Sequence, residues 1–339
     1  MALTINTNVS SLIAQRNLNS ATSALNSSIE KMTTGFKINH ASDNAAGYSI
    51  ANSWDTQISS LDVAADNAAT GADMLTTAEE TYSLLTSHLQ RVRDLTEQAA
   101  NGTYGSQSLR AIQSEVAARL QEINRISANA EFNGIKLMAY DLENADKNSQ
   151  VGMTADGINL QVGLYADADS RINLSVELFS NASLSGIFYQ KLKDTAGESG
   201  KTLTELVQAA GGKLDALYKD ENLQAFAAAC SGLVYKNGDY VLQTDKTCGA
   251  KEMLSFIDSA INDISDRVTR IGAAQNRVSS AITALDVQSQ NLTSSLSTLR
   301  DTDVAEESSN YIQSQILQQA SATLLSTANQ LPSIALNLI

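Results

Sequence analysis

Residues 254–299 read LSFIDSAINDISDRVTRIGAAQNRVSSAITALDVQSQNLTSSLSTL, and this stretch decides the fold. Its apolar residues recur at steps of three and four, and only Gln275 and Ser289 interrupt the series. The series comprises Leu254, Ile257, Ile261, Ile264, Val268, Ile271, Val278, Ile282, Leu285, Leu292, Leu296 and Leu299. This heptad pattern predicts one continuous coiled-coil helix. Such a helix spans about 70 Å and therefore needs a long partner.

The N-terminal flank supplies a partner helix whose apolar residues have the same spacing of three and four. They form two runs, and the spacing shifts by one residue between them. The runs are Ile58, Leu61, Ala65, Ala68, Ala72, Leu75, and then Ala78, Tyr82, Leu85, Leu89, Val92, Thr96, Ala99. Residues 101–105, NGTYG, predict the end of this helix. A second helix follows, with one apolar face formed by Leu109, Ile112, Val116, Leu120 and Ile123. The Asn133-Gly134 pair then predicts a hairpin turn, since it accepts positive φ.

The composition excludes several classes of function. The net charge is −14 without a dense Lys/Arg cluster, which argues against a nucleic-acid partner. The sequence has no run of about 18 apolar residues, so no transmembrane helix is expected. The N-terminus does not show the pattern of a cleavable secretory signal. His40 and His88 are far apart, so no metal site is expected, and no motif indicates a catalytic residue or a cofactor. The single proline, Pro332, permits very long helices.

The two ends of the chain are helical but almost uncharged. Residues 2–15 and 308–339 contain no charged side chain. One interpretation is a pair of frayed termini. The other is a pair of helices that other chains bury on all sides, which the depletion of charge at interface cores favours. On the second interpretation, self-association uses Leu18, Leu25, Ile29, Met32, Ile316, Leu317, Leu324 and Leu331.

The middle of the chain contains a possible disulfide. Residues 233–242 predict a hairpin around Asn237-Gly238, and Cys230 and Cys248 are equally distant from Asp239. The two cysteines could therefore meet at the base of the hairpin, in a disulfide worth about 3 kcal/mol. A two-residue turn would instead place Cys230 opposite residue 245, so the pattern leaves the pairing open.

An ordered set of motifs in both flanks resembles the bacterial flagellins. The set covers more than half of the chain and is specific as a series, although no single motif is decisive. It comprises Leu3–Asn8, Thr33–Asn39 (TTGFKIN), Ala41–Gly47 (ASDNAAG), Gln90–Leu95 (QRVRDL), Phe132–Gly134, Gln275–Arg277, Gln315–Ala320 (QILQQA) and Ala328–Gln330. Residues 160–163 and 172–174 resemble the last strands that the family shares.

The resemblance implies a mainly α fold, in which both chain ends form a long antiparallel coiled-coil bundle. Residues 1–45 with 300–339 would form an inner coiled-coil domain, and residues 46–55 a linker. Residues 56–184 with 251–299 would form a helical tube-wall domain with β-hairpins. Residues 185–250 would be a small α+β insert that projects outward.

The same resemblance implies a structural subunit that polymerises into the flagellar filament. Its partners would be copies of itself, hook-associated and cap proteins, an export chaperone at the C-terminal end, and the flagellar type III export apparatus. The protein would act outside the cell. A hook–filament junction protein is the alternative, but the motifs within the helices favour the filament subunit. A membrane-active translocator would need a long apolar hairpin, which this sequence lacks.

The resemblance also implies a receptor surface. Arg91, Leu95 and Glu115 match the positions at which similar flagellins bind Toll-like receptor 5. On an ideal helix, Arg91, Leu95 and Gln98 lie about 60–120° from the seam, which predicts an exposed stripe. Contact with neighbouring protofilaments is the other interpretation of this stripe. The full set of candidates is Gln90, Arg91, Leu95, Gln98, Glu115 and Arg119.

Overall fold

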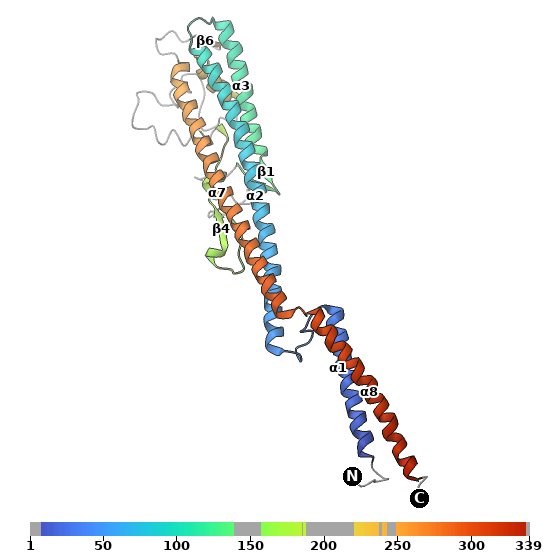
Figure 1. Ribbon diagram of the computed structural model, residues 1–339. Helices are drawn as coiled ribbons and strands as arrows, with labels where there is room; N and C mark the ends of the chain where they lie inside the picture. The colour runs from blue at the N-terminus through green and yellow to red at the C-terminus, as the bar shows by residue number, and fades with distance from the viewer. Residues whose placement is uncertain are drawn as a thin grey trace. The chain divides into compact units, whose positions relative to one another are not determined.

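The computed structural model describes residues 8–138, 157–184, 186–187, 220–236, 239–242 and 249–336 (Figure 1). Long helices dominate it, which confirms the mainly α fold. These helices are α1 (Val9–Thr34), α2 (Ala45–Ala100), α3 (Ser106–Asn129), α7 (Gly249–Arg300) and α8 (Val304–Leu336). The contacts divide the chain into unit 1, Met1–Asp62 with Val287–Ile339, and unit 2, Val63–Asp286.

The predicted seam of α7 is confirmed, and it forms part of the core of unit 2. Ile257, Ile264, Ile271 and Val278 are all completely buried. The interruption at Gln275 has a polar partner on α2, because its Nε2 donates to Glu79 Oε2 at 2.8 Å. In unit 1, Ser289 Oγ donates to Asp62 Oδ1 at 3.5 Å. Both breaks in the apolar series are therefore places where α7 and α2 make polar contacts.

The predicted end of α2, the apolar face of α3 and the hairpin are also confirmed. Val116, Leu120 and Ile123 of α3 are fully buried. Asn133 and Gly134 have φ angles of 49° and 81°, which suit a tight two-residue turn. They join β1 (Glu131–Phe132) to β2 (Ile135–Lys136), and β3 (Ile158–Gln161) pairs antiparallel with β4 (Arg171–Leu174) after the short helix η2 (Ala168–Ser170).

A buried arginine ties the segment after β4 to the helices of unit 2. This segment contains the short helix η3 (Val176–Phe179). Arg267 Nη1 donates to the carbonyl oxygens of Ser180 at 3.1 Å and Asn181 at 3.5 Å, and Nη2 donates to Asp263 at 2.8 Å. From α2, the hydroxyl of the buried Tyr82 donates to the carbonyl of Leu178 at 3.0 Å. The segment thus connects α2 and α7.

The described part of residues 185–250 contributes to the core of unit 2. It contains α6 (Asp220–Cys230), and β5 (Leu233–Lys236), which pairs with β6 (Asp239–Leu242) as the predicted hairpin. α6 packs on α3, where Gln113 Nε2 donates to the carbonyl of Gln224 at 3.4 Å. Its buried side chains join the main hydrophobic cluster, and they are Leu223, Ala225, Phe226, Ala227, Ala228, Ala229 and Cys230.

The connection between α1 and α2 lies at residues 35–44, and the expected linker 46–55 is wrong because these residues are helical. Gly35 ends α1 with φ 77°, a conformation that glycine adopts without strain. Within unit 1, Lys37 N donates to the carbonyl of Arg300 at 2.7 Å, and the Arg300 guanidinium lies 4.0 Å from the Phe36 ring centroid. Arg300 also pairs with Asp55 at 2.8 Å. These contacts therefore hold the connection between α1 and α2 against the connection between α7 and α8.

Candidate assembly surface

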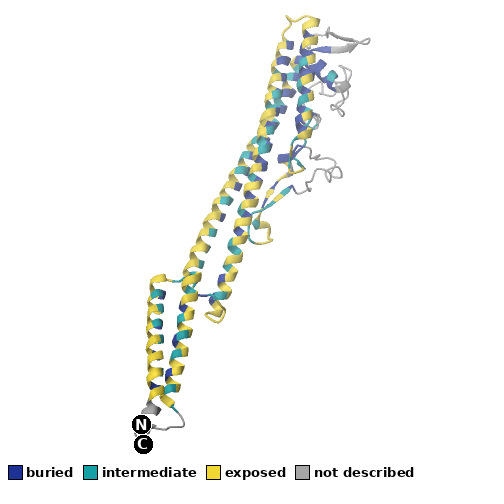
Figure 2. Ribbon diagram, turned by 90° about the vertical axis from the view of Figure 1, so that its right-hand side faces the viewer, coloured by how far each residue is buried: buried dark blue, intermediate teal, exposed yellow. Residues whose placement is uncertain are grey.

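The two terminal helices, α1 and α8, pack against each other through small side chains (Figure 1). Each helix buries one small residue per heptad. The buried small residues are Ala14, Ala21 and Ser28 on α1, and Ser314, Ser321 and Ala328 on α8, where Glu307 is buried one heptad before Ser314. Side chains of this size let two helix backbones approach closely, but they remove little apolar surface from water. In Figure 2 both helices accordingly carry mainly exposed and intermediate colours.

The structure separates the predicted self-association residues into two groups. Leu18 and Leu25 are half-buried and flank the seam. Five others are exposed: Ile29 by 44%, Met32 by 37%, Ile316 by 60%, Leu317 by 51% and Leu324 by 61%. The side chain of Leu331 lies outside the described residues. The predicted face of α8 is thus not the face that packs on α1, because the small residues take that place.

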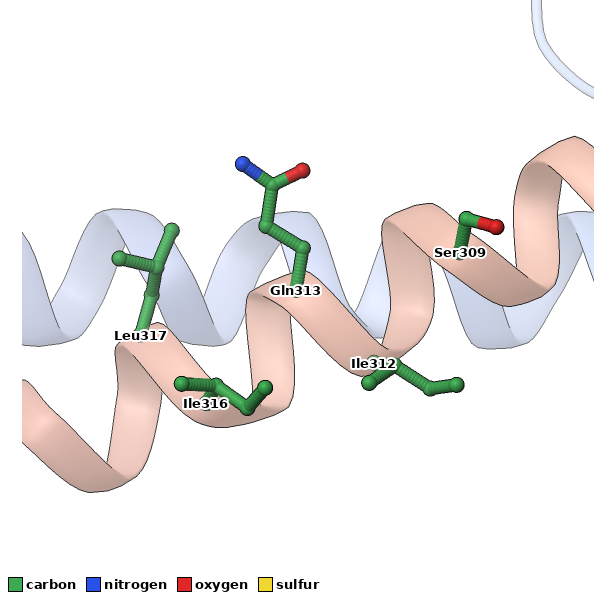
Figure 3. A pocket seen from close by; sticks show the side chains of 5 residues that line it. All are labelled: Ser309, Ile312, Gln313, Ile316 and Leu317. Atoms are coloured by element: carbon green, nitrogen blue, oxygen red, sulfur yellow. The ribbon is translucent and has the colours of Figure 1, made fainter.

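The exposed apolar side chains of α8 lie around a hollow. Ser309, Ile312, Gln313, Ile316 and Leu317 line it, and Figure 3 shows them on α8 with the pale blue ribbon of α1 behind. None of the five is charged. Near the other end of the pair, Val9, Leu12 and Ile13 of α1 are exposed as well. Such concentrated, uncharged apolar surface is typical of a site that another protein covers.

The predicted receptor stripe is present in part. Gln90, Arg91 and Gln98 are exposed, while Glu115 and Arg119 are half-buried. Arg91 donates to Glu115 Oε1 through Nε at 2.9 Å and Nη2 at 2.8 Å, so the two candidates form one ion pair between α2 and α3.

The predicted exposure of Leu95 is wrong, because its side chain is only 2% exposed. Leu95 lies one helical turn from Arg91, on the side of α2 that faces α3. Two residues further along from Arg91, Arg93 pairs with Asp258 of α7 at 2.6 Å. α2 therefore lies between two helices, and its buried arc is wider than a single seam.

Cys230 is a free and completely buried thiol. Burial raises its pKa to about 12, although a hydrogen bond with Thr96 opposes the shift. Cys248 lies outside the described residues, so the disulfide between the two cysteines stays a prediction. Because only the thiolate is nucleophilic, Cys230 acts here as a small core residue between α6 and α2.

A metal site and a membrane-spanning helix each set requirements on the described part of the chain. In that part, no group of three or more His, Cys, Asp or Glu side chains could hold a metal ion. None of the helices described is both long and apolar enough to cross a membrane.

Paired long helices that expose apolar side chains near the chain ends are typical of a structural protein that packs against other protein chains. Comparison with known proteins gives the family. Residues 5–141 match the bacterial flagellin N-terminal helical region, and residues 254–339 match the bacterial flagellin C-terminal helical region. The chain belongs to the bacterial flagellin family.

Curated relatives match the chain over its whole length. Polar flagellin F of Vibrio parahaemolyticus is 34% identical over 377 residues, and Flagellin D of Vibrio anguillarum is 34% identical over 391 residues. Each alignment covers 100% of this chain and 100% of the relative. The protein is therefore a structural subunit of the flagellar filament and not an enzyme, and nothing favours the hook–filament junction alternative.

Proposed function

We propose that copies of this chain join through the exposed apolar faces of α1 and α8. The observation that carries the proposal is the large exposed fraction of Ile312, Ile316 and Leu317 on a helix without charged neighbours. Water contact with this face is unfavourable, and a second copy offers surface of the same kind. A contact between different faces of two copies generates an open helical filament when its rotation does not close into a ring.

Seeded growth of the purified chain tests this proposal. Ile316→Ser should raise the critical concentration for growth about thirtyfold, because burying an isoleucine contributes about 2 kcal/mol. Ala322→Ser is the matched control on the exposed surface of the same helix, and it should change the critical concentration little. Equal critical concentrations for Ile316→Ser and the unaltered chain would contradict the proposed interface.

We also propose that the chain passes through the flagellar type III export apparatus with its N-terminus uncleaved. An export chaperone in the cytoplasm would cover the C-terminal end. Hook-associated and cap proteins would lie at the ends of the filament outside the cell. The same apolar face of α8 supports this proposal, since exposed surface of that kind favours aggregation before export. Pull-down of a cytoplasmic partner by the full chain, but not by a chain ending at residue 303, would test it.

Toll-like receptor 5 is the proposed host partner, and the Arg91–Glu115 ion pair is the proposed contact. The proposal rests on the match of these two positions to the family's receptor site, together with their accessibility in the single chain. We expect the monomer to bind and the filament not to bind, because neighbouring protofilaments would cover α2 and α3.

Arg91→Ala in the monomer should weaken binding to the receptor ectodomain at least tenfold, as expected for an arginine anchor. Arg125→Ala is the control, since Arg125 is another exposed arginine, paired with Glu122 of α3 at 2.5 Å. If Arg91→Ala and Arg125→Ala bind equally well, the receptor contact lies elsewhere. Leu95→Ala is not informative here, because it would remove a core side chain.

A further inference from the structure

The only proline of the chain lies inside α8 and leaves one backbone carbonyl without its helical partner. α8 runs from Val304 to Leu336 and therefore continues through Pro332. In an α-helix, the carbonyl of Ala328 would accept from the N–H of residue 332, but proline has no N–H. Because an unpaired backbone carbonyl is unfavourable when it is shielded from water, this oxygen needs a donor from elsewhere.

Asn8 supplies that donor from the other end of the chain. Its Nδ2 donates to the carbonyl oxygen of Ala328 at 2.7 Å. The Oδ1 of the same amide accepts from Ser11 N at 3.1 Å and so caps the first turn of α1. One side-chain amide thus begins α1 and completes the hydrogen bonding of α8. Beside it, Ser11 Oγ donates to Asn329 Oδ1 at 2.7 Å.

The apolar seam between α1 and α8 specifies their register only weakly. Its small buried residues repeat every seven positions on both helices, as in Ala14 and Ala21 against Ser314 and Ser321. A slip of one heptad, about 10.5 Å along the axis, would again place small residues opposite small residues along most of the seam, with the buried Glu307 of α8 as the exception. In helix pairs with such repetitive seams, a single polar contact can select the register.

We propose that Asn8 and Pro332 act as a matched pair that fixes the register of α1 against α8 at the end of the pair where α1 begins, while the hydrogen bonds from Lys37 N to the Arg300 carbonyl and from Thr302 N to the Gly35 carbonyl hold the other end. Pro332 frees the Ala328 carbonyl, and Asn8 can reach this oxygen in one register only. The register then fixes which exposed apolar side chains of α1 lie beside those of α8, and so the shape of the assembly surface. This inference rests on the proposed assembly function.

A double-mutant cycle in seeded growth tests the pair with the full chain. Asn8→Ser keeps the N-cap, because serine caps helices as well as asparagine does, but its short side chain cannot reach Ala328. It should raise the critical concentration about tenfold, as expected when a shielded acceptor loses its donor. Pro332→Ala restores the missing N–H. In that background, Asn8→Ser should raise the critical concentration less than threefold, which is a measurable coupling.

The outcomes separate the two proposals. If Asn8→Ser has the same effect with proline as with alanine at position 332, or no effect in either case, the matched pair is refuted. Seeded growth of the unaltered chain is judged first, and its failure would count against the assembly proposal itself. Asn19→Ser, an exposed asparagine on the same helix, is the control for the substitution and should leave growth unchanged.

Discussion

A chain trimmed to residues 46–299 is expected to fold and to form no filaments. The trim removes α1 and α8 with the connection between α1 and α2, but it leaves the hydrophobic core of unit 2 intact. Every buried member of that core lies between Ala68 and Val278. The trimmed chain should therefore keep a cooperative thermal transition within a few degrees of that of the full chain, measured by circular dichroism. Electron microscopy of seeded samples should show no growth.

The same reasoning predicts that residues 1–45 and 300–339 are disordered in the soluble subunit and fold on assembly. The seam between α1 and α8 buries side chains no larger than alanine and serine at its centre, so it cannot offset the entropy of ordering two long helices. Hydrogen exchange should be fast in both ends of the monomer and slow in the filament. Growth of filaments from the trimmed chain, or slow exchange of the ends in the monomer, would contradict this account.

The sequence predicted best the elements whose packing is repetitive and local. The α7 seam and the Asn133-Gly134 turn each follow from a strong pattern in a short stretch, namely a heptad repeat and a pair of residues that accept positive φ. The sequence also showed which polar residues interrupt the seam, although only the structure shows that Gln275 contacts Glu79. In these regions, local preference and tertiary packing agree.

The sequence was a poor guide where packing depends on a third helix or on small residues. The prediction from the seam assumed that α2 packs against one partner helix, and it therefore made Leu95 an exposed residue. In the structure, α2 packs against both α3 and α7. α6 was missed because its alanine-rich sequence has no apolar periodicity when all sides are buried. On α8, the large residues Leu317 and Leu324 define the most apolar face, yet the serine and alanine face packs on α1.

Arg267 is the second residue where a large effect is expected, this time on the stability of unit 2. Its side chain is only 9% exposed and neutralises Asp263, while its other contacts are the carbonyls of Ser180 and Asn181. Arg267→Ala would leave these carbonyls without a donor and the carboxylate without a partner. Removing one member of such a buried, charged hydrogen-bonded group costs about 3 kcal/mol.

Arg270→Ala is the matched control, because Arg270 lies on the same helix and pairs with Glu177 of the same segment. The side chains of that pair are 59% and 60% exposed, so solvent screens the interaction and its loss should cost less than about 1 kcal/mol. Denaturant unfolding of the trimmed chain, residues 46–299, measures both variants without interference from assembly. Arg267→Ala should lower the free energy of unfolding by about 3 kcal/mol, whereas Arg270→Ala should leave it nearly unchanged. Equal losses in the two variants would mean that the segment after β4 is held by its apolar side chains, and that the buried arginine contributes no more than a surface ion pair.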